Sequence, residues 1–194
     1  MARILYCWET QTLADVPGRA RALARDLAAR GHELALMVSD TNAAGRELRG
    51  SGLAYYQAPV PVMALRYTRL RNFADSLAAT GFLDLDALRR LQRGWRQWFS
   101  LLRPDVLVVD HAPVAQLAAC LNGVPCLRLG DGFDLPPEAS PLPVLQPWIA
   151  QPPAQQQHDE AAILRNVNAL LQEAGRSEEH TSELQSRETI SYAV

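Results

Sequence analysis

Arg3-Ile-Leu-Tyr-Cys-Trp8 opens the chain as a short apolar run, and Glu33-Leu-Ala-Leu-Met-Val38 repeats that pattern further along. Each run is typical of a buried strand in a parallel sheet. Between them, apolar residues recur at helical spacing over residues 16–28, with Asp15 at the N-cap position and Gly31 as the stop. A strand, a helix and a strand in this order form a βαβ unit, whose right-handed crossover predicts two parallel strands.

The middle of the chain continues this alternation. Residues 85–102 have the spacing of an amphipathic helix that Asp84 or Asp86 can cap and that Pro104 ends. The alternation predicts an α/β fold with a Rossmann-like, doubly wound parallel sheet. The other predictions are a weak strand at 54–57, a strand at 106–110, a helix at 114–121 ended by Asn122-Gly123, a strand at 126–129, an irregular Pro-rich stretch at 130–157 and a helix from about 159 to 174.

The composition limits the class of protein. The chain has 194 residues, of which 48% are hydrophobic, enough for one domain with a full core. Its 19 basic residues are all Arg and face 21 acidic residues, so no basic field predicts a nucleic-acid partner. We expect no transmembrane segment, because every apolar run is short, and no signal peptide, because the first apolar run meets a charge at Glu9. Three cysteines without a CxxC pair predict free thiols in the cytoplasm.

Residues 176–194 differ sharply from the Ala-, Leu- and Arg-rich sequence before them, because they are rich in Ser, Thr and Glu. The string RSEEHTSELQS resembles the translation of a common sequencing adapter, and RETISYAV resembles its index and continuation. We therefore expect residues 1–175 to be an incomplete Rossmann-like domain and residues 176–194 to be an adapter-derived, disordered tail. The natural gene is then expected to continue beyond Gly175, and the chain is expected to be a fragment.

Ligands of an open parallel sheet bind beyond the carboxyl ends of its strands. The loop after the first predicted strand lacks the glycines that let a backbone approach a pyrophosphate, and a chain without Lys excludes a P-loop. No residues have zinc-ligand spacing, and no GxSxG nucleophile elbow is present. The polar and aromatic candidates after the strands are Glu9, Thr10, Asp15, Asp110, His111, Asp131 and Phe133.

Four segments carry a resemblance to a known family. They are the opening strand, the helix end Ala22–Glu33 (ALARDLAARGHE), the phrase Leu102–Asp110 (LRPDVLVVD) and the phrase Leu121–Pro125 (LNGVP). In this order and spacing, they resemble the N-terminal half of GT-B glycosyltransferases of the UDP-glycosyltransferase type, in the bacterial branch that modifies antibiotics and other natural products. The resemblance extends over most of residues 1–175.

This resemblance implies that the chain is the acceptor-binding half of a two-domain enzyme. The full-length enzyme would transfer a sugar with inversion from a UDP- or dTDP-linked donor to the hydroxyl of a small-molecule acceptor. The donor half is missing, so we expect this fragment to hold no cofactor or metal and to be inactive alone. The resemblance implies Asp15 and Asp110 as catalytic residues, whereas Glu9, Thr10, His111, Asp131 and Phe133 are expected to line the acceptor site.

The role of Asp15 stays open between two alternatives. If Asp15 faces Asp110, a second carboxylate close by would raise one pKa and make a usable base. If Asp15 is only the N-cap of the first helix, the backbone amides would lower its pKa and weaken it as a base. His111 is likewise either a base or acceptor contact, or a hydrogen-bonded structural residue, and His32 is expected to be structural because it lies at the opposite sheet edge.

A second function class fits the same sequence. The first loop has lost the glycines that the family carries, which favours a non-catalytic, Rossmann-like binding or partner protein. The sequence names neither the acceptor nor the sugar, and it leaves the oligomeric state open.

Overall fold

The computed structural model describes residues 1–9, 16–61, 70–130, 139–150 and 152–175. These residues form two compact units. The first unit contains Met1–Val60 and Gln92–Gly130, and the second contains the described residues of Pro61–Leu91 and those after 130. In chain order, the elements are β1 (Arg3–Trp8), α1 (Val16–Ala28), β2 (Glu33–Val38), α2 (Thr41–Glu47), β3 (Ala54–Gln57), α3 (Phe73–Ala79), α4 (Leu85–Leu102), β4 (Val106–Val109), α5 (Pro113–Asn122), β5 (Cys126–Arg128) and α6 (Pro153–Glu173).

The first unit contains a five-stranded parallel sheet with the order β3-β2-β1-β4-β5. The chain order therefore reverses between β1 and β4, which makes their carboxyl ends the topological switch point of the sheet. This arrangement confirms the predicted Rossmann-like α/β fold. All five predicted strands are present, with β1 and β2 at the predicted residues.

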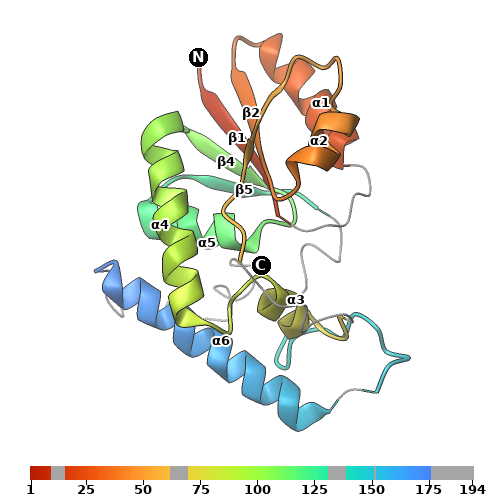
Figure 1. Cartoon of the computed structure of the whole chain (residues 1–194), viewed down its shortest axis with the longest axis vertical. Coiled ribbons are helices and arrows are strands. Elements are labelled where there is room, and N and C mark those ends of the chain that lie inside the picture. Colours follow the sequence, from red (N-terminus) through yellow and green to blue (C-terminus); the bar gives the residue numbers. More distant parts are fainter. Residues whose placement is uncertain (10–15, 62–69, 131–138, 151, 176–194) are drawn as a thin grey trace. The chain divides into compact units, whose positions relative to one another are not determined.

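Helices cover both faces of this sheet (Figure 1). On one face, Ala20 of α1, Ala44 of α2 and Leu48, the C-cap residue of α2, are buried against the sheet. On the other face lie α5 and the part of α4 within this unit, where Gln92 Nε2 donates a hydrogen bond to the Val114 carbonyl. The strand residues of the first face are Ile4, Tyr6, Trp8, Leu36, Val38 and Val108.

Two short helices, α2 and α3, were absent from the sequence prediction. Both are seven residues long, too short for a clear apolar period. Their signals are their caps, because Asp40 accepts hydrogen bonds from the amides of Asn42 and Ala43, and Asn72 accepts one from the Asp75 amide.

The predicted start of the last helix was wrong. Helix α6 begins at Pro153 rather than near residue 159, inside the stretch predicted to be irregular. Proline is well suited to the first turn of a helix, and the glutamines that follow are good helix formers, so Pro153 marks the start of α6. In residues 139–150, the regular pairing among described residues is a single antiparallel bridge between Asn72 and Val144.

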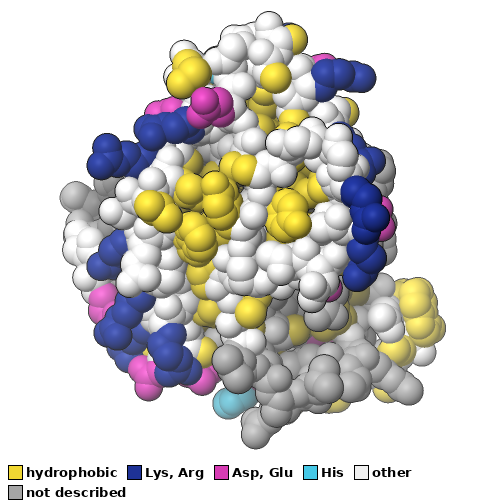
Figure 2. Space-filling view, turned by 45° about the horizontal axis from the view of Figure 1, so that its top comes forward, with side chains coloured by type: hydrophobic (Ala, Val, Ile, Leu, Met, Phe, Trp, Pro, Cys, Tyr) yellow, Lys and Arg dark blue, Asp and Glu magenta, His cyan; other side chains and the backbone are white. Residues whose placement is uncertain are grey.

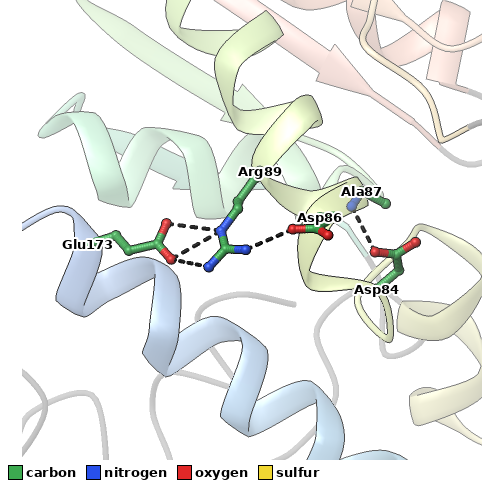
Figure 3. A network of polar contacts seen from close by, with 5 residues as sticks. All are labelled: Asp84, Asp86, Ala87, Arg89 and Glu173. Carbon is green, nitrogen blue, oxygen red and sulfur yellow. Dashed lines mark hydrogen bonds and ion pairs between the residues drawn. The ribbon is translucent and has the colours of Figure 1, made fainter.

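In the second unit, α3 packs against α6 (Figure 1). Figure 3 shows the polar network at the start of α4, where the Arg89 guanidinium lies between Asp86 of its own helix and Glu173 of α6. Asp84 accepts a hydrogen bond of 2.9 Å from the Ala87 amide. Of the two predicted caps, Asp84 is therefore the N-cap, and Asp86 is an ion-pair partner of Arg89.

Exposed hydrophobic side chains gather near the middle of the face that Figure 2 presents, and Arg side chains lie mainly along its margins. No helix among the described residues combines the length and apolar character needed to cross a bilayer. The cysteines Cys7, Cys120 and Cys126 are free thiols, as predicted.

Candidate functional site

The carboxyl ends of β1 and β4 bring three predicted site residues to one edge of the sheet. The Asp110 amide donates to the Cys7 carbonyl at 2.9 Å, and the Glu9 amide donates to the His111 carbonyl at 3.2 Å. Glu9, Asp110 and His111 are therefore neighbours along the backbone at the switch point. This is the edge where parallel α/β sheets bind their ligands.

Asp110 is fully buried and bonded on the α1 face of the sheet. Arg19 of α1 donates from Nη2 to Oδ1 at 2.8 Å and from Nε to Oδ2 at 3.0 Å. The Tyr6 hydroxyl, from β1, also donates to Oδ2. The Asp110 carboxylate is thus held by three donors from its own sheet face.

This cluster fixes the charges of its members. Burial, followed by the hydrogen bond to Asp110, raises the pKa of the Tyr6 hydroxyl and keeps it neutral. Burial acts against the charge of Arg19, but hydrogen bonds to Asp110 and Tyr6 raise the pKa of its guanidinium overall. The result is a permanent cation beside a buried anion. Neither Tyr6 nor Arg19 was predicted as a site residue, because neither follows a strand.

Glu9 lies on the opposite face of the sheet. Its Oε2 accepts a hydrogen bond of 2.8 Å from the Val114 amide in the first turn of α5. The N-cap residue of α5 is Ala112, which has no side chain able to cap the helix. Glu9 therefore caps α5 from the end of β1, using the free amides and positive dipole end of that helix.

The hydrogen bonds to the Glu9 carboxyl group offset only part of the cost of burying its charge. Burial raises its pKa to about 8, although the amides of Val114 and Ala115 and the indole of Trp95 favour the ionised form. The Trp95 indole lies near this carboxyl group, but its Nε1 and Oε1 of Glu9, both buried, form no hydrogen bond of normal geometry among the described residues. A carboxyl group with a pKa near neutrality can accept and release a proton under physiological conditions.

His111 adopts a left-handed backbone conformation, with φ of 52°. Histidine is among the residues that adopt this region more readily than most. The conformation turns the chain between β4 and α5 and directs the His111 carbonyl at the Glu9 amide. His32 lies at the other edge of the sheet, where its Nδ1 accepts a hydrogen bond from the Ala2 amide, in agreement with the predicted structural role.

Four predicted site residues, Thr10, Asp15, Asp131 and Phe133, lie outside the described residues. Their roles, and the proposed pairing of Asp15 with Asp110, stay predictions. Within the part of the chain that is described, no three His, Cys, Asp or Glu side chains are grouped so that they could hold a metal ion.

Comparisons with known proteins give a consistent fold. No family model and no curated protein matches the chain. Among solved structures, the kitacinnamycin glycosyltransferase has a TM-score of 0.51 at 20% identity, with 90% of this chain and 41% of that chain covered. CalG4, the calicheamicin glycosyltransferase, has a TM-score of 0.52 at 16% identity, with coverages of 90% and 43%.

SsfS6, a glycosyltransferase of Streptomyces sp. SF2575, has a TM-score of 0.50 at 16% identity, with 90% of this chain and 47% of that chain covered. The chain thus spans less than half the length of the solved proteins that it matches. At these identities, the likeness establishes the fold, which is the Rossmann-like α/β fold of GT-B glycosyltransferases, as the sequence resemblance predicted.

Proposed function

We propose that this chain is the acceptor-binding part of an inverting glycosyltransferase that modifies a small-molecule hydroxyl. The observation that supports this most strongly is the superposition of 90% of the chain on less than half of several glycosyltransferases. The donor, a UDP- or dTDP-linked sugar, would bind to a part of the enzyme that this chain does not contain. The free thiols support a cytoplasmic protein.

In this proposal, the switch-point edge of the sheet holds the acceptor. Glu9, Thr10, His111, Asp131 and Phe133 line the acceptor site, and Asp15 and Asp110 are the candidate catalytic carboxylates. The ion pair with Arg19 fixes the orientation of the Asp110 carboxylate at this edge. The fragment alone lacks the donor site, so we expect no turnover from it.

The second candidate function is a non-catalytic binding or partner protein. The contacts of Asp110 favour it, because Arg19 and Tyr6 already bond the carboxylate that the resemblance assigns to catalysis. The glycine-poor first loop points in the same direction.

Sequencing the natural gene past the codon for Gly175 separates the two functions. A continuing frame that encodes a second Rossmann-like domain supports the transferase, whereas a prompt stop codon supports the binding protein. The full-length product should then be incubated with UDP- and dTDP-sugars and a panel of hydroxylated small molecules, and products followed by mass spectrometry. A mass increase of one sugar is expected. Failure of the two-domain protein to transfer from any donor would contradict the proposed function.

A further inference from the structure

The guanidinium group of Arg19 has one side bonded to the protein and one side open. Arg19 lies in the first turn of α1, at the carboxyl edge of the sheet, where its Nε and Nη2 donate to Asp110. Nη1 takes part in none of these bonds and is not among the buried polar atoms that lack a partner in the described part of the chain. The side chain is 30% exposed, so solvent reaches its outer end at the ligand-binding edge.

The inner side of the guanidinium group fixes the direction of the outer one. A guanidinium group is planar, so its bonds to Asp110 also orient the two N–H groups of Nη1. The Asp110 carboxylate is itself held, because it is fully buried and accepts a hydrogen bond from the Tyr6 hydroxyl. The Nη1 donors are therefore oriented before any ligand arrives, and binding loses little side-chain entropy.

The charge of this donor is already balanced. Arg19 is a permanent cation, and the buried Asp110 carboxylate beside it cancels its charge. The open end is then the positive end of a fixed dipole, which favours a hydrogen bond to an oxygen atom over general attraction of anions. Carbonyl and carboxylate oxygens suit Nη1 best, because they only accept hydrogen bonds, whereas a hydroxyl also brings a donor that Nη1 cannot accept.

We propose that Arg19 selects the acceptor, by donating hydrogen bonds from Nη1 to a carbonyl or carboxylate oxygen of that molecule. This inference rests on the proposed transferase function and adds the class of acceptor, a hydroxylated small molecule that also carries a carbonyl or carboxylate group. Arg19 orients this molecule at the switch-point edge and moves no proton. Tyr6 and Asp110 act through Arg19, because they hold its guanidinium group in place.

The first test measures binding to the chain as it is. The probes are three phenols that differ in one substituent: para-hydroxyacetophenone, para-hydroxybenzoate and para-ethylphenol. NMR titration of the isotope-labelled chain should show that the acetyl or the carboxylate probe binds at least about 10-fold more tightly than the ethyl probe. Arg19→Lys should reduce this preference to less than about twofold, because lysine keeps a cation beside Asp110 but lacks the planar second arm. The control, Arg21→Lys, at an exposed position of the same helix, should keep the preference.

The two probes with an oxygen substituent separate the two ligand chemistries. A preference for the carboxylate probe that weakens at high salt identifies a carboxylate ligand, and a salt-independent preference for the acetyl probe identifies a neutral carbonyl. A second measurement needs no variant, because the guanidinium resonances of the wild-type chain should include one that shifts with the favoured probe and not with para-ethylphenol. A wild-type chain without the preference, or a folded Arg19→Lys chain that retains it, would overturn the proposal.

The second test measures transfer by the full-length protein. With an acceptor of the favoured class, Arg19→Lys should raise the acceptor KM by about 10-fold, with kcat within about threefold and the donor KM unchanged. Transfer with an unchanged acceptor KM would overturn the role of Arg19 and leave the proposed function standing. A full-length wild-type protein that binds the favoured probe but transfers no sugar would overturn the proposed function, and with it the role of Arg19 in choosing an acceptor.

Discussion

Glu9 and Asp110 follow neighbouring strands, yet the two faces of the sheet treat their carboxylates in opposite ways. On the α1 face, Asp110 is completely buried and bonded to a guanidinium and a phenol. On the α5 face, the Glu9 carboxyl group meets backbone amides and an indole, all of them dipoles without a net charge. The first carboxylate is compensated by charge, and the second retains much of its desolvation cost.

The two carboxyl groups therefore depend on different partners. The Asp110 carboxylate is held by charge-assisted hydrogen bonds from a permanent cation. The buried Glu9 carboxyl group contacts only uncharged dipoles. Burial raises its pKa to about 8, so it loses its proton near neutral pH. We therefore expect the Asp110 ion pair to stabilise the fold, and Glu9 to be the carboxyl group that changes its protonation near neutral pH.

The largest effect expected at a fixed pH comes from removing the cation. Arg19→Met leaves Asp110 buried and unpaired, which should lower the free energy of unfolding by about 3 kcal/mol, as measured by urea denaturation. The matched control is Arg3→Met, because the Arg3–Asp105 pair is about half exposed and should contribute less than about 1 kcal/mol. Equal losses in the two variants would show that the Asp110 cluster is not an anchor.

The next effect is a pH dependence on the Glu9 face. Its pKa is about 8 in the folded chain and about 4.3 in the unfolded chain, so the unfolded state ionises first as the pH rises. Stability contributed by the neutral carboxyl group is therefore full below about pH 4 and is lost progressively up to about pH 8, by at most about 1.4 kcal/mol per pH unit.

Glu9→Gln should abolish this decline, because glutamine does not titrate. Denaturation series between about pH 5 and pH 9 would measure it. The neighbouring Cys7 does not interfere, because burial and then the charge of Glu9 raise the pKa of its thiol. If Glu9→Gln kept the wild-type slope of stability against pH, the pH dependence would come from another group.

A smaller effect is expected from the second partner of Asp110. Tyr6→Phe removes one donor but leaves the Arg19 contacts, so the free energy of unfolding should fall by about 1.5 kcal/mol, the value of a hydrogen bond to a charged group. Combining Tyr6→Phe with Arg19→Met measures their coupling. Strictly additive losses would argue against one cooperative cluster.

The smallest effect is expected at Asp40, which caps α2 from an exposed position. Asp40→Ala should cost about 1 kcal/mol, the usual value of an N-cap, by thermal unfolding. A loss as large as that of Arg19→Met would show that this exposed cap contributes more than local hydrogen bonds to the amides of Asn42 and Ala43.

Much of the fold was predictable from local patterns. The apolar runs at Arg3–Trp8 and Glu33–Val38, and the helix between them, follow from residue spacing that needs no partner. The short helices α2 and α3 were missed because one or two turns carry little periodicity. The start of α6 was misplaced because proline fits both an irregular segment and a first helical turn.

Local patterns were enough to predict that Glu9 and Asp110 follow strands of one parallel sheet and therefore lie at one edge. Their surroundings depend on contacts between segments that are far apart in the chain. The pairing of Cys7 with Val109 sets Asp110 level with Trp8, so Asp110 shares the α1 face while Glu9 turns to the α5 face. Side-chain alternation is local, but the register between β1 and β4 depends on how distant segments pack. That packing brings Arg19 to one carboxylate and Trp95 to the other.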